Sequence, residues 1–156
     1  MEKKEIVEFV MEIMKRTRAG FMSTLNEDGL PEIRAIKNFW CPELYEGHPA
    51  KVLAEIEEDP LTIYVSTNTS STKMKQIKEN PNVAIYYSIP EEYKGVMFQG
   101  EVEIMDDVDF KKILWYKSWT MFYPTGHEDP DFTILKLKPK RLKAWKSGVH
   151  ELELSG

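Results

Sequence analysis

A cluster of hydroxyl side chains followed by a lysine is the feature of this sequence best suited to chemistry. In the stretch YVSTNTSSTKMKQIKENPNVAIYY, which begins at Tyr64, six of the seven residues at 66–72 are Ser or Thr, and Lys73 follows directly. Hydroxyl groups between a strand and a helix commonly cap the turn. Together with the free backbone N–H groups of a helix start, they also suit a phosphate. Both interpretations are open at this point.

Lys73 occupies an unusual position for a cation. A short amphipathic helix is predicted for residues 72–79, so Ser71 stands at its start and Lys73 lies in its first turn. A positive charge there opposes the helix dipole unless a negative group lies nearby. The alternative is an ordinary solvated lysine on an exposed helix face.

Arg34 is a second cation that could contact such a phosphate. It lies on a strand predicted to pair near residues 61–67, and a guanidinium offers a bidentate fork to phosphate oxygens. In this interpretation two cations and several hydroxyl groups converge. Arg34 could equally pair across strands with Glu32 or Glu101, which would be a structural role.

Short β-rich runs, separated by turns and helices, must position these residues. Helices are predicted for residues 3–17 (ending near Gly20), around 50–57, 72–79 and about 107–119. Strands are predicted for residues 21–25, 30–40, 61–67, 82–89, 94–105 and two runs on either side of Pro139. The first two strands form a hairpin around NEDG, with Ile36 on one face and Ile33, Ala35 and Lys37 on the other. Many short antiparallel runs with a few helices predict an α+β protein whose sheet closes into a small barrel.

The composition limits the class of protein. A chain of 156 residues that is 42% hydrophobic suits a single domain over residues 1–156. The net charge of −5 argues against a nucleic-acid partner. The N-terminus lacks an apolar segment long enough for a signal peptide or membrane span, so we expect a soluble cytoplasmic protein without a membrane partner. Cys41 is alone, and the GHEDPD loop at 126–131 lacks the spacing of known zinc and calcium sites, so no metal site is expected.

The order of these patterns resembles the FMN-binding split barrel of the pyridoxamine 5′-phosphate oxidase-like superfamily. The strongest local pattern is S-x-K-x-x-x-I-x-x-N-P-x-V, which starts at Ser71 and leads into an apolar strand. The closing run WTMFYPTGHEDPDFTILKLKPKRLKAW resembles the general stress protein branch, and the resemblance covers nearly all of residues 4–146. It implies an antiparallel, Greek-key-like split β-barrel with peripheral helices. It also implies a homodimer that holds FMN in two clefts at the interface.

The resemblance also implies which positions hold the cofactor. Along the flavin and its ribityl chain it places Arg34, Ala35, Ile36, Lys37 and Asn38. Beside the ribityl and phosphate groups it places Ser66 and Thr67, and on the phosphate itself Ser71, Thr72 and Lys73. The aromatic candidates for packing against the isoalloxazine, from either subunit, are Trp115, Trp119 and Trp145.

Two departures from the resemblance bear on the reaction. The true oxidases carry an arginine where this chain has Thr72, and they end in a basic substrate-binding tail where this chain ends SGVHELELSG. Oxidation of vitamin B6 phosphates is therefore not expected. The resemblance implies instead a small flavin-dependent oxidoreductase for an unknown small-molecule acceptor, with no assigned catalytic residue and with Tyr123 or His127 as candidate proton donors. The alternatives are a non-catalytic flavin-binding module with a sensing or stress-protective role, and a binder of a deazaflavin or haem.

Overall fold

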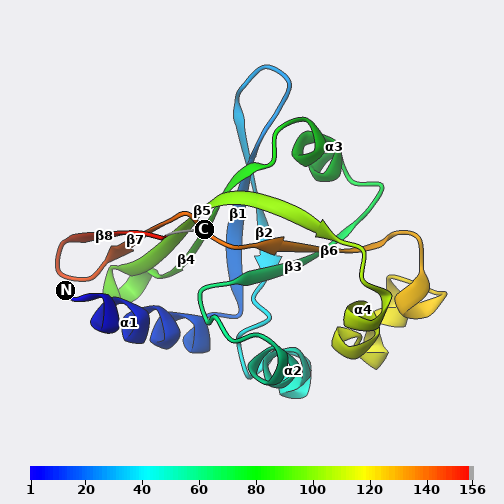
Figure 1. Cartoon of the computed structure of the whole chain (residues 1–156), viewed down its shortest axis with the longest axis horizontal. Helices are drawn as coiled ribbons and strands as arrows, with labels where there is room; N and C mark the ends of the chain where they lie inside the picture. The colour runs from blue at the N-terminus through cyan, green and yellow to red at the C-terminus, as the bar shows by residue number, and fades with distance from the viewer. Residues whose placement is uncertain (155–156) are drawn as a thin grey trace.

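The computed structural model describes residues 1–154, and its centre is one curled antiparallel sheet (Figure 1). The strands are β1 (Ala19–Leu25), β2 (Pro31–Lys37), β3 (Ile63–Asn68), β4 (Asn82–Ile89), β5 (Lys94–Met105), β6 (Phe132–Leu137), β7 (Arg141–Trp145) and β8 (Val149–Glu153). They are ordered β2-β1-β4-β5-β6-β3, with β7 paired to β5 and β8 paired to β7. β5 pairs with β4 along its first part and with β6 along its last part. The long β5 therefore joins the two halves of a split barrel, and the predicted fold class is confirmed.

The helices lie at the periphery of the sheet (Figure 1). Within residues 1–154 the α-helices are α1 (Lys3–Arg16), α2 (His48–Ile56), α3 (Thr72–Glu79) and α4 (Val108–Leu114). The short 3-10 turns are η1 (Leu44–Gly47), η2 (Pro90–Glu92), η3 (Lys117–Met121) and η4 (Gly126–Glu128). α1 packs against β4 and β5, α2 packs against α4, and α3 packs against β1. No helix among the described residues is long and apolar enough to cross a membrane.

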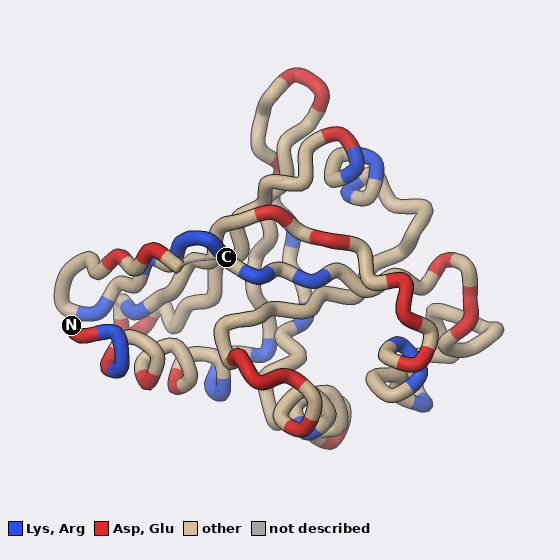
Figure 2. Tube along the Cα trace, viewed as in Figure 1, with Lys and Arg blue, Asp and Glu red and all other residues tan. Residues whose placement is uncertain are grey.

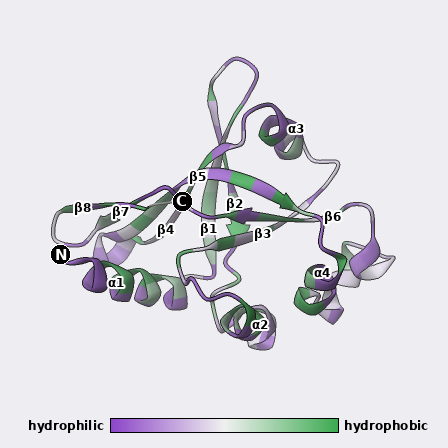
Figure 3. Ribbon diagram, in the orientation of Figure 1, coloured by the Kyte–Doolittle hydropathy of each residue, from purple (hydrophilic) through white to green (hydrophobic). Residues whose placement is uncertain are grey.

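The sequence of α1 explains why it covers the sheet. Most of its apolar side chains recur at helical spacing and are buried, whereas Met11 and the Glu and Lys residues of the helix are exposed. Figure 3 shows hydrophobic and hydrophilic residues alternating along α1. Burying each large apolar side chain contributes about 1.5–3 kcal/mol before the entropic cost of ordering it. The predicted end near Gly20 is wrong, because Thr17 is already extended and Gly20 lies in β1. A Cβ at Gly20 would come within 2.5 Å of the Tyr87 ring, so this strand position needs a glycine.

The β1–β2 hairpin is confirmed, although β2 ends at Lys37 rather than Trp40. Gly29 in the turn has φ +77°, a conformation that glycine adopts without strain. Ile36 is buried, while Ile33, Ala35 and Lys37 face outward as the alternation predicts. Two residues of this outward face, Ala35 and Lys37, line the cavity described below.

Two predictions for the C-terminal half are wrong. The helix expected over 107–119 is broken, because α4 ends at Leu114 and the backbone is extended at Trp115 before η3 begins. The break brings Trp115 edge-on to Trp119 at 5.7 Å and to Phe132 at 5.1 Å, within a second, aromatic core between α2, α4 and η3. Beyond the two expected last strands, β8 adds a third, which follows a turn at Ser147 with φ +48°.

Candidate functional site

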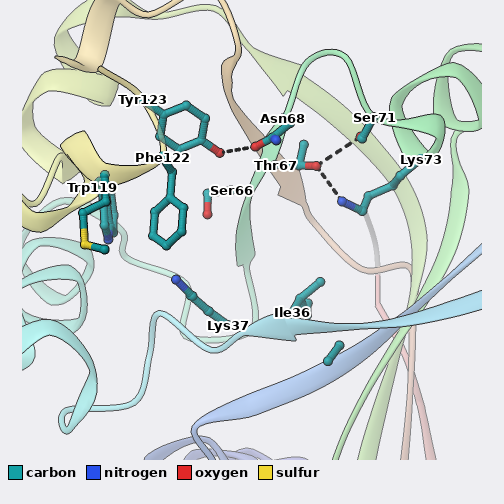
Figure 4. Close-up of a pocket in the computed structure, with 12 residues that line it drawn as sticks. Ile36, Lys37, Ser66, Thr67, Asn68, Ser71, Lys73, Trp119, Phe122 and Tyr123 are labelled. Carbon is teal, nitrogen blue, oxygen red and sulfur yellow. Dashed lines mark hydrogen bonds between the residues drawn. The ribbon is translucent and has the colours of Figure 1, made fainter. Parts of the chain in front are cut away.

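A cavity of about 640 Å³ lies between β2, β3, the start of α3 and η3 (Figure 4). It is lined by Ala35, Ile36, Lys37, Ser66, Thr67, Asn68, Ser71, Lys73, Trp119, Met121, Phe122 and Tyr123. This volume is typical of pockets that bind cofactors and small molecules. One wall carries hydroxyl groups and an ammonium group, and another is aromatic.

Lys73 is the central cation of the polar wall. Its ammonium group is partly buried and donates a hydrogen bond to Thr67 Oγ1 at 2.5 Å (Figure 4). The Thr67 and Ser71 hydroxyl oxygens are 3.4 Å apart, so three polar groups meet there. Among residues 1–154, no carboxylate lies within ion-pair distance of Lys73. Burial lowers the pKa of Lys73, and the positive charge of Arg34 lowers it further.

Arg34 stands behind this wall rather than on it. Its guanidinium donates to Thr24 Oγ1 at 2.6 Å and to Gln76 Oε1 at 3.4 Å, and lies 4.0 Å from a Glu32 oxygen. Burial lowers the pKa of Arg34, and Glu32 partly offsets this. The structural alternative therefore holds for Glu32, but the pair is formed within β2 and not across strands. Glu101 pairs with a lysine of the β6–β7 turn instead. Arg34 ties β1, β2 and α3 together and places a second positive charge beside Lys73.

Some residues of the hydroxyl cluster at 66–72 hold the loop, and others line the cavity. Thr69 donates to the Pro130 carbonyl at 2.8 Å, and the Ser70 N–H donates to Asp131 Oδ1 at 2.8 Å, so both residues hold the loop. Ser71 is the N-cap residue of α3, but its side chain makes no capping hydrogen bond to the helix. Its hydroxyl group lies on the cavity wall instead. Figure 2 shows basic residues along α3, the helix that Ser71 precedes. Thr69 and Ser70 therefore stabilise the loop, as the capping interpretation predicts, whereas Ser71 lines the cavity.

The aromatic wall is held rigidly from behind. The Trp119 ring stacks on Phe39 with centroids 5.5 Å apart and meets Tyr45 edge-on at 5.3 Å. Trp119 is buried, and its Nε1 has no hydrogen-bond acceptor among the described residues. Such an unmatched buried donor costs free energy unless a ligand supplies an acceptor.

Tyr123 links the aromatic wall of the cavity to Asn68 at the end of β3. Its hydroxyl donates to Asn68 Oδ1 at 2.7 Å (Figure 4). Burial, helped by the negative charges of Asp131 and Asp129, raises the pKa of Tyr123 to about 12. Tyr123 therefore stays protonated at neutral pH, and its hydrogen bond to Oδ1 leaves the Asn68 amide NH₂ without a partner among residues 1–154.

The structure brings most of the predicted cofactor residues together. On the cavity wall lie Ala35, Ile36, Lys37, Ser66, Thr67, Ser71, Lys73 and Trp119. Outside it lie Arg34, Asn38, Thr72 and Trp145. Asn38 is buried and donates to backbone carbonyls at the end of α1, and Trp145 packs edge-on to Tyr86 at 5.7 Å. Thr72 lines a separate shallow depression.

Four lining residues were absent from the predicted cofactor set: Asn68, Met121, Phe122 and Tyr123. Asn68 lies within the hydroxyl cluster, and its position at the end of β3 could have identified it as a lining residue. The other three lie two to four residues after Trp119, where a turn rather than a helix was needed to aim them at the cavity. Of the two proton-donor candidates, Tyr123 lines the cavity and His127 does not.

A family model described as pyridoxamine 5′-phosphate oxidase like matches residues 44–154. General stress protein 26 of Bacillus subtilis (strain 168) is 24% identical over 151 residues, which are 95% of this chain and 94% of that protein.

Solved structures share the fold. A protein from Clostridium acetobutylicum, related to general stress protein 26 of B. subtilis, superposes with a TM-score of 0.76 and 22% identity, covering 98% of this chain and 97% of its own. A pyridoxamine 5′-phosphate oxidase-related, FMN binding protein from Nostoc punctiforme PCC 73102 gives a TM-score of 0.59 and 13% identity, covering 100% and 99%. At these identities the likeness establishes the split-barrel fold.

Proposed function

The chain belongs to the pyridoxamine 5′-phosphate oxidase-like family, and on that premise we propose that it binds FMN in this cavity as a small flavin-dependent oxidoreductase. The observation that carries the proposal is Lys73, a partly buried cation on the cavity wall that has no anionic partner among the described residues. A phosphate would supply that partner. The FMN binding protein of similar fold supports the choice of flavin.

The polar wall fits the phosphate of FMN. Lys73 offers ammonium donors, and Thr67 and Ser71 offer hydroxyl groups. Arg34 adds a second positive charge beside Lys73, so the wall carries about the charge that a dianion needs. Thr72 would not contribute, because it lies outside the cavity.

The aromatic wall fits the ring system of FMN. Trp119 and Tyr123 give flat apolar surface, and the unmatched Trp119 Nε1 is a donor for which a ring carbonyl is a suitable acceptor. Bound FMN would supply the redox chemistry, while the protein would supply orientation and electrostatics. Tyr123, which stays protonated, would hold a proton close to the reacting ring.

A second copy of the chain would complete the site. Phe21 of β1 and Ile33 of β2 are 47% and 69% exposed and lie on the outward face of the hairpin. Ala35 and Lys37 lie on the same face and line the cavity, so the exposed apolar surface runs directly into it. Covering this surface would remove apolar area from water and enclose the ligand. The proposed assembly is therefore a homodimer with FMN at the interface.

Single-turnover redox spectroscopy tests the proposed reaction. The FMN-saturated protein is mixed without oxygen with NADH or NADPH, and then with a panel of quinones and nitroaromatic compounds. Loss of the oxidised flavin absorbance and its return with an acceptor are the expected results. Tightly bound FMN that responds to no donor and no acceptor would instead identify a flavin-binding module without turnover.

A further inference from the structure

Lys37 is a second cation on the cavity wall that the phosphate site does not use. Figure 4 shows its ammonium group directed toward Phe122, whereas Lys73 points toward Thr67. Within residues 1–154, no carboxylate lies within ion-pair distance of Lys37. Lys37 and Lys73 are also the charged side chains on the described cavity wall, which carries no acidic residue. In a chain with net charge −5, a cavity with only positive side chains selects for anions.

The ammonium group of Lys37 is held by Tyr45, a residue whose own backbone is strained. Its ammonium group donates a hydrogen bond to the Tyr45 hydroxyl and lies 4.9 Å from the centre of the Tyr45 ring. Tyr45 and Glu46 both have positive φ, at +50° and +56°. A non-glycine residue with such a φ is strained and persists only where its surroundings hold it there. Here Tyr45 is held by Trp119 at 5.3 Å and by Tyr116 at 5.4 Å, so the strain serves to place a partner for Lys37.

The surroundings of Lys37 favour a flat ligand. Phe122 is 60% exposed, and its ring centre lies 5.1 Å from the Lys37 ammonium nitrogen. Met121, next to it on the wall, is also exposed. An apolar planar compound could therefore lie against Phe122 while its charged end meets Lys37.

We propose that this end of the cavity binds a planar, conjugated acceptor that carries a carboxylate, and that Lys37 is the residue that recognises it. The inference rests on the proposed function, since it assumes that a phosphate occupies the Lys73 end. The two ends differ in charge: Lys73 has Arg34 beside it, which suits a dianion, whereas Lys37 stands alone, which suits a monoanion. One donor of Lys37 is used by Tyr45, and two remain for the carboxylate oxygens.

Equilibrium binding of three probes tests the inference. Benzoate, benzamide and phenyl phosphate share one ring and differ in charge, and each is titrated into FMN-saturated protein while the flavin absorbance is recorded. The variants are Lys37→Met, Lys37→Arg and the control Lys117→Met, which removes an exposed lysine that lies 6.0 Å from the Tyr116 ring centre and outside the cavity. The affinity of each variant for FMN is measured first, so that saturation is known.

We expect benzoate to bind about tenfold more tightly than benzamide. This factor is at the low end of the range for a hydrogen bond to a charged group, because Lys37 is exposed and water screens its charge. This preference should disappear in Lys37→Met and persist in Lys37→Arg and Lys117→Met. Equal binding of benzoate and benzamide, or a preference that survives in Lys37→Met, would overturn the inference. Tighter binding of phenyl phosphate than of benzoate would overturn the monoanion assignment. A wild-type chain that does not bind FMN would instead defeat the proposed function before any probe is added.

Discussion

At the scale of single residues, the polar wall of the cavity is defined by two positive charges held close together. Lys73 donates to Thr67, while Arg34 is fixed behind it by Thr24 and Gln76. Burial lowers the pKa of Lys73, and repulsion between its charge and that of Arg34 lowers it further. A bound dianion would remove the repulsion, so the phosphate should gain from both groups.

The first prediction concerns the contribution of Lys73 to binding. Lys73→Ala should weaken FMN binding by about 1–3 kcal/mol, because a charge-assisted hydrogen bond to the phosphate is lost. Riboflavin, which has no phosphate, should bind the variant and the wild type about equally. Fluorescence titration measures both. Lys75→Ala, which removes an exposed lysine two residues further along α3, is the control and should leave FMN affinity unchanged.

The second prediction is a pH dependence of FMN affinity. The charged form of Lys73 binds the phosphate, and the pKa of Lys73 in the free protein lies below its usual value of 10.5. FMN affinity should therefore decline as the pH rises through that lowered pKa, before free lysines lose their protons. In Lys73→Arg the decline should be absent, because a guanidinium stays charged. An identical alkaline decline in both proteins would show that another group titrates.

At the scale of secondary-structure elements, α1 is joined to the β4–β5 connection by an exposed charge cluster. Glu92 accepts hydrogen bonds from Arg16 of α1 and from Lys94 of β5, and the second bond measures 3.1 Å. The hydrogen bond from Arg16, followed by that from Lys94, lowers the pKa of Glu92 from 4.5 to about 2. The cluster therefore holds the end of α1 to the sheet where the connection turns.

The third prediction follows from this lowered pKa. A depressed carboxylate pKa adds stability that is present above pH 4.5 and is lost as the pH falls toward 2. Glu92→Gln should therefore show a smaller loss of stability than the wild type over this range. Urea midpoints measured from pH 6 to pH 2 test this, and high salt should reduce the difference because the pair is exposed. Glu58→Gln, which changes an exposed carboxylate that lies in none of the ion pairs of residues 1–154, is the control.

Most elements could be predicted from local patterns, and the failures have identifiable causes. Alternation and turn residues located the β1–β2 hairpin, β4 and β5, and the position of a cation at a helix start singled out Lys73. The break after Leu114 could not be predicted, because it depends on Trp115 packing against Phe132, which is distant in sequence. β8 was missed because two of its five residues are charged and because its observed partner strand is β7 alone among the described residues.

The cavity was harder to predict than the fold. Its polar wall comes from one continuous stretch, which is why Thr67, Ser71 and Lys73 could be recognised together. Its aromatic wall depends on the turn at η3, which aims Tyr123 at Asn68, 55 positions earlier in the chain, and Phe122 at Lys37 of β2. Such a wall is a property of tertiary packing and leaves little trace in local sequence.

At the scale of the whole molecule, the outward sheet face around the hairpin exposes large apolar side chains to solvent in a single chain. Ile33 and Phe21 are exposed there, and the same face opens into the cavity. In the proposed homodimer this face is covered and the ligand is enclosed. Assembly and cofactor binding should therefore be coupled.

The fourth prediction tests this coupling. Ile33→Glu should shift the protein from dimer to monomer and weaken FMN binding, because a charge would be buried in the proposed interface. Sedimentation velocity gives the assembly state, and titration gives the affinity. Met11→Glu, on the outer surface of α1, adds the same charge and should change neither. A wild-type chain that sediments as a monomer while binding FMN fully would rule out the dimeric site.

The central claim is that the cavity holds FMN by its phosphate, and a visible absorbance titration tests it most directly. The purified protein is titrated with FMN and, in parallel, with riboflavin, and the spectrum of the bound flavin gives each affinity. Saturable binding with a clear preference for FMN is the result the account predicts, since Lys73 would contact the phosphate, which riboflavin lacks, and Arg34 would add its positive charge from behind the wall. Equal affinity for the two flavins, or binding of neither, would contradict it.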